Sequence, residues 1–418
     1  MSENLIIKHY IKLSNIPRYL LVALSSIAGY ILYFISFFIP RKKNIWIFGS
    51  WGGKRFSDNS KYLFLYVANN HKSDIKSIWI SKDKKIINEL RNNNYCAFHA
   101  YELRGIYYNL VAKYIFSDSY FNSVNFWCCG GATRIQLWHG LMLKKIEHDA
   151  RNLPWHRPFF RFFYYFLAPW ILAKNDYVLS SSDMVSDIFS SAFCIKKEKI
   201  ILAGLPRNDI IFNSIHGYDL LDKTIFNDIA NIKLNYPESK LILYMPTFRD
   251  SESKDNINVN MDLETLNSFL ENVDGFILMK FHPTINMYID YNKKNRIIFL
   301  PGNLDIYPIL NKIDILITDY SSIYLDFLFT GKPIIFYPYD LNNYLKQDRD
   351  LYFDYNEFTP GPKAFTFSEL LNWINYFIND KDDFIDFRKK IKDKCFKYDD
   401  GKASYRVYNS IKKIELEV

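Results

Sequence analysis

The sequence is poor in cysteine, and its cysteines do not form spaced pairs. It contains five cysteines, none of them in a CxxC arrangement. They are Cys96, Cys128, Cys129, Cys194 and Cys395. This pattern argues against a disulfide framework and against a zinc scaffold, and it favours a reduced, cytoplasmic setting.

The motifs of several common enzyme classes are also missing. The sequence has no GxGxxG fingerprint, P-loop, HExxH or GxSxG, which argues against dehydrogenases, P-loop ATPases, zinc proteases and serine hydrolases. No group of His, Cys, Asp and Glu has metal-ligand spacing, so we predict no tightly bound cofactor and no metal, while a loosely held Mg²⁺ stays open. Recognised nucleic-acid-binding modules are absent, and we expect no nucleic acid partner.

Positive charge and aromatic side chains are in excess. Lys and Arg number 53 against 45 Asp and Glu, and aromatic residues make up 18% of the chain. A formal charge of +8 favours anionic partners such as phospholipid or a phosphate-rich polymer. With 418 residues the chain exceeds the usual size of one hydrophobic core, so we expect two domains.

An uncharged segment near the N-terminus runs from Tyr19 to Pro40. Crossing a bilayer takes about 20 apolar residues, so this segment predicts a hydrophobic membrane helix. Arg41, Lys42 and Lys43 follow it directly and place the rest of the chain on the cytoplasmic face of the cell membrane. Basic residues also precede the segment, which leaves open a spanning helix, an interfacial helix and a buried helix of a soluble protein.

A second apolar segment, Pro154–Ala173, is dense in aromatic residues and flanked by arginines. Pro169 interrupts it, and it is too short to span a membrane. We expect it to contact an anionic membrane surface, and the alternative is a pair of helices in the core.

Short apolar runs alternate with stretches of helical spacing along the rest of the chain. The predicted strands are Ile45–Phe48, Ser77–Ile80, Tyr114–Ser117, Ile135–Leu137, Tyr177–Ser180, Ile200–Ala203, Leu241–Tyr244, Phe276–Lys280, Ile297–Leu300, Ile313–Thr318 and Pro333–Tyr337. Such alternation predicts an α/β fold with two doubly wound, Rossmann-like domains that face a cleft. An interruption between Gly204 and Pro237 marks the boundary. The expected division is a membrane anchor at 1–44, domains at 45–215 and 216–400, and a C-terminal helix at 401–418.

Polar side chains follow two predicted strands of the second domain. Thr247 and Arg249 come after the first strand, and Lys280 and His282 lie at the end of the next. Open α/β sheets bind ligands at the carboxyl ends of their strands, and an arginine can hold a diphosphate through two parallel hydrogen bonds. A protonated histidine there would offset the charge of a leaving phosphate. The alternatives are a surface salt bridge for Arg249 and a structural role for His282.

A third strand of this domain leads into Thr318, Asp319, Ser321 and Ser322, with Asp326 one turn later. Hydroxyl groups and the free N–H groups of a helix start are a phosphate-binding arrangement. Ser321 or Ser322 can also be an ordinary helix cap, and the two roles are compatible.

In the first domain, His139 and Gly140 follow a predicted strand, and Lys144, Lys145 and Asp149 come soon after. A histidine at a strand end is a candidate general base, and a glycine beside it lets a ligand approach the backbone. A structural histidine is the alternative.

These clusters, taken in order, resemble the CDP-glycerol glycerophosphotransferase family, whose members make teichoic acids and related phosphate-containing capsules. The resemblance extends from about Ile45 to the C-terminus. It is carried by Trp138-His139-Gly140 with Lys144-Lys145, Gly204-Leu-Pro-Arg-Asn-Asp209, Pro246-Thr-Phe-Arg249, Lys280-Phe-His-Pro283, Thr318-Asp-Tyr-Ser-Ser322 with Asp326, Gly331-Lys-Pro333, Asp340, Pro360-Gly-Pro362, and Gly401-Lys-Ala-Ser404 with Arg406.

The resemblance implies a GT-B architecture in which the second domain holds the donor, CDP-glycerol or CDP-ribitol. The first domain would hold a lipid-linked or polymeric acceptor, whose hydroxyl attacks phosphorus and releases CMP. His139 would be the base, and Arg249 and His282 would stabilise the diphosphate. The remaining donor residues would be Thr247, Lys280, Thr318, Asp319, Ser321, Ser322 and Asp326, the last of these toward a polyol hydroxyl, and the acceptor side would have Gly140, Lys144, Lys145 and Asp149.

One departure and two rival functions remain. Relatives commonly have Thr-Pro after the Trp-His-Gly triplet, where this chain has Leu141 and Met142, a departure that bears on the acceptor contacts more than on the chemistry. A GT-B glycosyltransferase that uses a nucleotide sugar is the first rival, and a non-enzymatic membrane-surface module is the second. The sequence does not distinguish glycerol from ribitol phosphate or a primase from a polymerase, and it is silent on oligomeric state.

Overall fold

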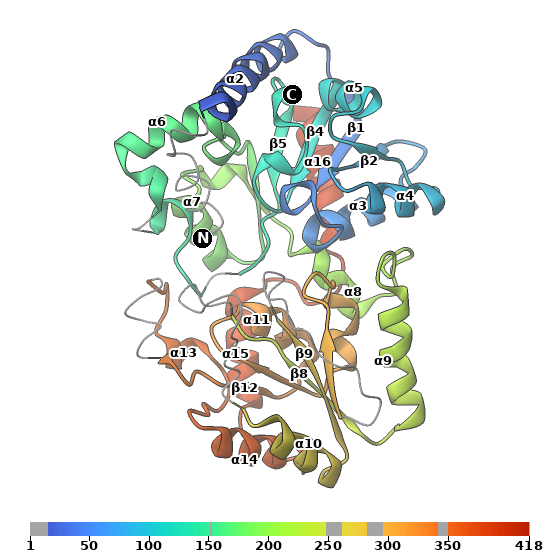
Figure 1. The fold of residues 1–418 in the computed structure, drawn as a ribbon, viewed down its shortest axis with the longest axis vertical. Coiled ribbons are helices and arrows are strands. Elements are labelled where there is room, and N and C mark those ends of the chain that lie inside the picture. The colour runs from blue at the N-terminus through green and yellow to red at the C-terminus, as the bar shows by residue number, and fades with distance from the viewer. Residues whose placement is uncertain are drawn as a thin grey trace.

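The computed structural model describes residues 16–141, 143–150, 153–247, 261–281, 296–341 and 350–417. These residues form two lobes, each built on a parallel sheet with helices on both faces (Figure 1). The strands are β1 Lys42–Gly49, β2 Lys76–Ser81, β3 Ala97–His99, β4 Ala112–Ser117, β5 Thr133–Gln136, β6 Tyr177–Ser180, β7 Ile200–Leu202, β8 Lys240–Tyr244, β9 Gly275–Lys280, β10 Ile297–Leu300, β11 Ile315–Thr318 and β12 Ile334–Phe336.

The seven-stranded sheet of the first lobe has the order β3-β2-β1-β4-β5-β6-β7. All its strand pairs are parallel. Both faces of β1 are buried: Trp46 and Phe48 pack into one apolar cluster, and Ile45 and Ile47 into another. Burial on both faces explains why these strands read as short continuous apolar runs. The strand order reverses between β1 and β4, which is where doubly wound sheets bind ligands.

The five-stranded sheet of the second lobe repeats this plan, with the order β10-β9-β8-β11-β12 and parallel pairing throughout. Its reversal lies between β8 and β11. The predicted α/β fold with two doubly wound parallel sheets is therefore confirmed. Each of the eleven predicted strands is present, and the short β3 is the one that the sequence pattern did not reveal.

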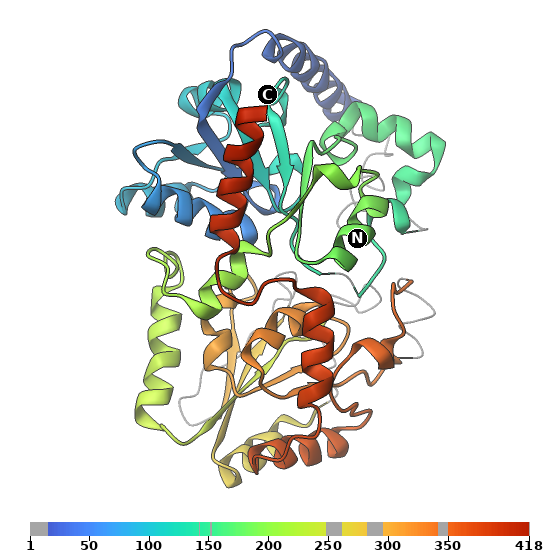
Figure 2. The same ribbon diagram turned by 180° about the vertical axis from the view of Figure 1, so that it is seen from behind.

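Fourteen α-helices in the described residues cover these sheets. They are α2 Ile16–Ser36, α3 Asp58–Asn70, α4 Lys84–Asn92, α5 Leu103–Val111, α6 Pro158–Leu167, α7 Asp183–Ala192, α8 Asp209–Phe212, α9 Lys223–Asn235, α10 Leu263–Asn272, α11 Ile323–Phe327, α13 Tyr355–Phe358, α14 Phe367–Ile378, α15 Ile385–Cys395 and α16 Ala403–Glu417. The last helix crosses back and lies against the first lobe (Figure 2), where Tyr408 stacks on His71 with 3.7 Å between ring centroids.

The N-terminal helix α2 packs one side against the first lobe. Gly29 permits the close approach, because a Cβ there would lie 2.5 Å from the ring of Trp127. Beside it, Tyr30 meets Trp127 edge-on and Tyr33 stacks on Phe126. In the part of the chain that the structure describes, no helix has the length and apolar character needed to cross a membrane. The structure therefore does not support the spanning form of the predicted N-terminal helix.

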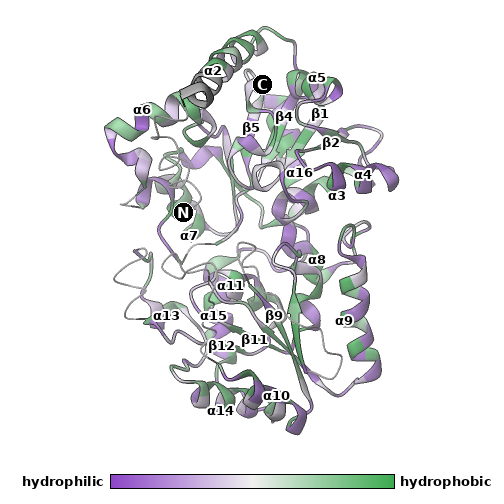
Figure 3. Cartoon of the chain, in the orientation of Figure 1, coloured by the Kyte–Doolittle hydropathy of each residue, from purple (hydrophilic) through white to green (hydrophobic). Residues whose placement is uncertain are grey.

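The opposite side of α2 is exposed and joins the exposed side of α6, and Figure 3 shows much of α2 as hydrophobic. Tyr30 of α2 stacks on Phe166 of α6. Large apolar side chains are exposed to solvent along both helices, including Phe34 of α2 (66% exposed) and Phe159 and Phe162 of α6 (71% each). The alternative that Pro154–Ala173 forms a core helix pair is wrong, because only one side chain of α6, Tyr164, is buried.

Candidate active site

Loops that follow the central strands of the two sheets meet at the interface between the lobes. His139 and Gly140 follow β5 in the first lobe, and Ser322 follows β11 in the second. A Cβ on Gly140 would lie 3.1 Å from Oγ of Ser322. A larger residue here would crowd Ser322 of the second lobe, whereas the sequence had suggested an approaching ligand.

The imidazole of His139 is held in one orientation. Its Nδ1 lies 2.7 Å from the backbone carbonyl oxygen of Asp118, which follows β4. A carbonyl only accepts hydrogen bonds, so Nδ1 carries the proton and Nε2 has the free lone pair. The ring also contacts the indoles of Trp51 and Trp138, at 5.0 and 4.3 Å between centroids. This geometry gives a histidine that is ready to accept a proton at Nε2.

The surroundings keep His139 neutral. Burial lowers the pKa of His139 below its ordinary value of 6.5, and the nearby positive charge of Arg207 acts in the same direction. The negative charge of Asp58 and the bond to Asp118 oppose this shift without reversing it. A neutral imidazole at neutral pH is what a general base requires.

Three non-glycine residues near His139 have left-handed backbones. Trp51, Asp58 and Trp138 have φ of 45°, 64° and 51°. Such conformations cost about 1–3 kcal/mol each, and they gather at functional sites. Trp51 and Asp58 were not predicted from the sequence, because neither residue type indicates by itself a backbone with positive φ.

Arg207 is the buried centre of the interface and is only 1% exposed. Its guanidinium donates to Oδ1 of Asp58 at 2.8 Å within the first lobe. From the other side it donates to both carboxylate oxygens of Asp326 in the second lobe, at 3.3 and 2.8 Å. The hydroxyl of Tyr307 donates to the same carboxylate. The sequence motif 204–209 contained Arg207 but gave it no role.

The start of α3 connects Arg207 to the loop of His139. The side-chain amide of Asn59 donates to the carbonyls of Leu137 and Trp138, at 3.2 and 2.7 Å. Its oxygen accepts from the backbone N–H of Arg207 at 3.1 Å. The base, the buried arginine and the second lobe therefore belong to one hydrogen-bonded unit.

Asp326 has a different environment from the one predicted. The sequence suggested that it contacts a polyol hydroxyl, but its carboxylate is fully buried and already bonded to Arg207 and Tyr307. The geometry makes it a contact between the lobes.

The other predicted donor residues lie at the reversal point of the second sheet. Asp319 accepts a hydrogen bond from the backbone N–H of Thr247 at 2.8 Å, which joins the loops after β8 and β11. The hydroxyl of Thr318 donates to the carbonyl of Met245 at 2.7 Å. Thr247, Thr318 and Asp319 are thereby brought together as predicted from their strand ends.

Ser321 and Ser322 follow directly and are partly buried. Ser322 precedes α11, which has five residues. Of the two, Ser322 is the one that approaches the first lobe, at Gly140.

Two cations, Lys280 and Arg55, lie near this interface. Lys280, at the end of β9, is buried and donates to the carbonyl of Gly302 at 3.0 Å. Burial and the positive charge of Arg55 lower the pKa of Lys280 to about 8. Arg55 itself lies over the indole of Trp51, 4.7 Å from the ring centroid, and was not predicted.

The acceptor-side residues Lys144, Lys145 and Asp149 lie where the lobes are joined a second time. Lys144 forms an antiparallel bridge with Leu351, and the backbone N–H of Lys145 donates to the carbonyl of Asp350. Asp149 accepts a 2.6 Å hydrogen bond from the hydroxyl of Tyr352. Their contact with an acceptor stays a prediction.

Arg249 and His282 lie outside the described residues, so their predicted roles also remain predictions. Within the described ranges, no group of three or more His, Cys, Asp or Glu side chains has an arrangement that could hold a metal ion.

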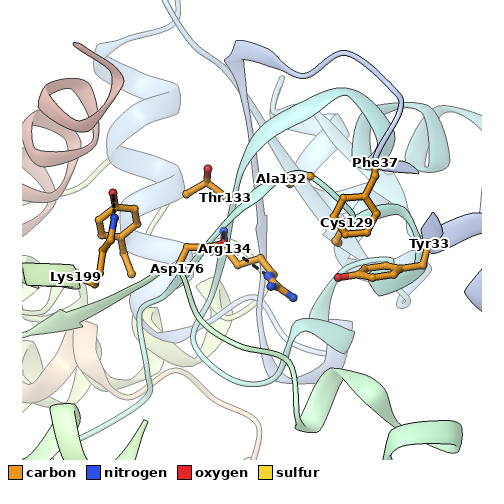
Figure 4. Close-up of a pocket in the computed structure, with 10 residues that line it drawn as sticks. Tyr33, Phe37, Cys129, Ala132, Thr133, Arg134, Asp176 and Lys199 are labelled. Atoms are coloured by element: carbon orange, nitrogen blue, oxygen red, sulfur yellow. Dashed lines mark hydrogen bonds and ion pairs between the residues drawn. The ribbon is translucent and has the colours of Figure 1, made fainter. Parts of the chain in front are cut away.

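A hollow of about 370 Å³ lies at the opposite edge of the first sheet, where β5 and β6 begin (Figure 4). Arg134 lies there beside Asp176, its Nε 3.7 Å from the carboxylate, and Tyr33 and Phe37 come from α2 and the turn after it. Because ligands of doubly wound sheets bind at the other edge, this hollow is separate from the site of His139.

Two doubly wound parallel sheets with a histidine at the interface between their lobes form a GT-B-like architecture. The model of the family CDP-glycerol:poly(glycerophosphate) glycerophosphotransferase matches residues 31–413. The chain belongs to this family, and it is therefore an enzyme of the glycerophosphotransferase class.

Relatives and solved structures agree with this assignment. The chain is 31% identical to a teichoic acid poly(glycerol phosphate) polymerase of Bacillus spizizenii over 82% of its length and 86% of the relative. It is 30% identical to a teichoic acid glycerol-phosphate transferase of Staphylococcus aureus, over 88% of its length and 93% of the relative. The structure of the wall teichoic acid polymerase TagF matches with a TM-score of 0.70 at 26% identity, over 90% of each chain. A structure of that polymerase soaked with CDPG matches equally well.

Proposed function

We propose that this enzyme transfers glycerol phosphate, or another polyol phosphate, from CDP-glycerol to a hydroxyl of a cell-surface polymer or its lipid-linked primer. CMP is the second product. The family membership supports the donor and the type of transfer. The observation that carries the proposal is the orientation of His139, whose Nδ1 is bonded to the carbonyl of Asp118, which leaves Nε2 as the nitrogen that can accept a proton.

In the proposed reaction, Nε2 of His139 takes the proton from the acceptor hydroxyl. The oxygen attacks the distal phosphorus of CDP-glycerol, and the bond from this phosphorus to the bridging oxygen breaks. The electron pair leaves on the phosphate of CMP. General-base catalysis of this kind contributes roughly 10²- to 10⁴-fold to the rate.

The second lobe would hold the donor at its sheet reversal. Thr247, Thr318 and Asp319 meet there, with Ser321 and Ser322 beside them, and Lys280 supplies positive charge toward the diphosphate. Arg249 and His282 are proposed for the same task from the sequence resemblance. Preorganised cations are effective because the diphosphate gains charge as CMP departs.

A donor panel tests this function. The full-length protein is incubated with CDP-glycerol, CDP-ribitol and several nucleotide sugars, with an oligo(glycerol phosphate) acceptor, and nucleotide release is followed. We expect acceptor-dependent CMP release from one CDP-polyol, and its loss in His139→Ala while CDP-glycerol still binds. Release from a nucleotide sugar alone would overturn the proposal in favour of a glycosyltransferase.

We also propose that the enzyme works at the cytoplasmic face of the cell membrane. The exposed apolar side chains of α2 and α6 adjoin the exposed cations Arg157 and Arg161. An apolar surface bordered by basic residues suits the interface of an anionic bilayer. This attachment would bring the first lobe next to a lipid-linked acceptor.

A further inference from the structure

The loop between β1 and α3 lies at the carboxyl end of β1, where the strand order of the first sheet reverses. Its backbone is unusual, because Trp51, Gly52 and Gly53 have φ of 45°, 66° and 81° in succession. Ligands of doubly wound sheets bind beside a loop in this position. The loop is therefore placed to contribute side chains to the reaction.

Hydrogen bonds to the neighbouring strands hold this loop in one conformation. The backbone N–H of Gly52 donates to Oγ of Ser123, which follows β4, at 3.1 Å. The carbonyl of Gly53 accepts hydrogen bonds from Oγ of Ser81 at 2.8 Å and from the backbone N–H of Lys82 at 2.7 Å, both at the end of β2. The loop is thus fixed before a ligand arrives, as a preorganised site requires.

Arg55 belongs to this loop and lies close to the proposed base. Its guanidinium carbon is 4.7 Å from the centroid of the Trp51 indole. The ring of His139 is 5.0 Å from the same indole, measured between centroids. One tryptophan therefore contacts both the base and the cation, which places the guanidinium near the atoms that react.

The positive charge of Arg55 is not neutralised by an ion pair within the described part of the chain. The carboxylate of Asp58 is already bonded to Arg207 at 2.8 Å. Burial raises the pKa of Asp118 well above its ordinary value, so this carboxyl group carries less negative charge at neutral pH. Burial lowers the pKa of Arg55, and the two carboxyl groups oppose this shift without reversing it. A half-buried guanidinium in this situation favours an anionic ligand.

A second cation lies across the interface, in the second lobe. Lys280 is 7% exposed and donates to the carbonyl of Gly302 at 3.0 Å. The segment after Gly302 contacts the first lobe through Asp305, which accepts a 2.7 Å hydrogen bond from Lys61. Burial and then the charge of Arg55 lower the pKa of Lys280 to about 8, so the two cations are close. Like charges in a partly buried interface repel each other, and a diphosphate between them would remove the repulsion.

We propose that Arg55 is a catalytic residue whose guanidinium binds the two non-bridging oxygens of the distal phosphate of the CDP donor during transfer. The acceptor oxygen forms its bond to this phosphorus while its proton passes to Nε2 of His139. The bond to the bridging oxygen breaks, and its electron pair leaves on CMP. Arg55 takes part in no covalent step, and it stabilises the charge on the non-bridging oxygens while Lys280 holds the diphosphate from the second lobe. The inference rests on the proposed function and adds to it a cation from the lobe that carries the base.

Arg55→Ala tests this role, and Lys54→Ala is the matched control because Lys54 is the neighbouring cation of the loop and is exposed. The kcat of CMP release and the Kd of CDP-glycerol are measured on the full-length proteins. Arg55→Ala should lower kcat about 10²- to 10³-fold, the loss expected for one preorganised donor to a transition state. Its Kd should change by less than about threefold, because the contact strengthens only in the transition state. Lys54→Ala should keep both values within about twofold of the parent, as an exposed substitution does.

A sulfur-substituted donor separates a contact with phosphate from a structural role. In two isomers of CDP-glycerol, sulfur replaces one or the other non-bridging oxygen of the distal phosphate, and sulfur accepts hydrogen bonds only weakly. For at least one isomer, sulfur should slow the parent protein about tenfold more than it slows Arg55→Ala, because the variant has lost the hydrogen bond in question. The effect in Lys54→Ala should equal that in the parent. A general loss of structure would lower all rates together and leave the ratio of oxygen to sulfur rates unchanged.

The outcomes separate this inference from the proposed function. If the parent releases CMP and Arg55→Ala retains its kcat, or if sulfur slows both proteins equally, Arg55 does not contact the transferring phosphate and the inference is overturned while the reaction stands. A weaker Kd with unchanged kcat would make Arg55 a contact of the bound donor alone, which also overturns the catalytic role. Absence of CMP release from every CDP donor in the parent protein would reject the proposed reaction, and this inference with it.

Discussion

Arg207 in the first lobe and Asp326 in the second form a buried ion pair with two hydrogen bonds across the interface. The same guanidinium bonds Asp58, and Asn59 joins its backbone to the loop of His139. The position of the base is therefore linked to the contact between the lobes. A change at this pair should affect both folding and catalysis.

Arg207→Ala should lower the free energy of unfolding by about 3–5 kcal/mol, because it leaves two buried carboxylates without a cation. Urea denaturation followed by circular dichroism measures the change. Arg388→Ala is the matched control, since Arg388 is also buried and ion-paired, with Asp382 inside the second lobe.

Both variants should be destabilised, but activity should separate them. Turnover is measured without urea and at low temperature, where each variant is folded. Under these conditions Arg207→Ala should lose activity, whereas Arg388→Ala should retain it. Equal turnover of the two variants would show that the interlobe pair has no part in placing His139.

The pH dependence of activity should report the state of His139. Burial holds its pKa below 6.5, and the base is active only when neutral. The value of kcat/KM should therefore decrease along an acid limb whose midpoint lies below pH 6.5, as the imidazole becomes protonated. A pH titration of CMP release measures this limb, and an acid limb centred above 6.5 would contradict the assignment.

Much of the fold could be predicted from the sequence, since buried parallel strands leave continuous apolar runs such as Ile297–Leu300, which coincides with β10. The missed strand β3 has three residues, too few to give a pattern. His139 and Thr318 could be found because strand ends place ligands in this class of fold.

The interface residues could not be predicted in the same way. Arg207 and Asp326 lie 119 residues apart, and Arg207 and Asp58 lie 149 apart. Their pairing depends on how the two lobes meet, which leaves no local trace in the sequence. For the same reason Asp326 was assigned to a ligand, although its partner is an arginine of the same chain.

Donor binding should weaken in alkaline solution because of Lys280. Its pKa is about 8, so the side chain is charged below this pH and loses its charge above it. The Kd of CDP-glycerol, measured by calorimetry between pH 7 and 9.5, should rise above pH 8. Lys280→Arg should remove this rise, because arginine stays protonated throughout the range.

Lys363 is the control for general alkaline effects. Burial lowers its pKa to about 8 as well, but it donates to the carbonyls of Thr359 and Gly361 and is not one of the proposed donor residues. Lys363→Arg should leave the pH dependence of the Kd unchanged. If both substitutions flatten it equally, the effect does not come from the donor site.

The exposed apolar surface of α6 should determine attachment to lipid. Phe159→Ser with Phe162→Ser removes two side chains that are 71% exposed. Burying one phenylalanine is worth about 1.5–3 kcal/mol, so the double variant should bind anionic vesicles at least about tenfold more weakly. Co-sedimentation with phosphatidylglycerol vesicles gives the partition constant.

Leu234→Ser is the matched control, because Leu234 is 78% exposed on α9 of the second lobe. It removes a similar apolar side chain at a distance from α2 and α6, and it should leave vesicle binding unchanged. Both proteins should retain the unfolding midpoint of the parent, because exposed side chains contribute little to the core. If the double variant and the control bind vesicles alike, α6 is not the contact with lipid. The acceptor would then have to reach His139 by another route.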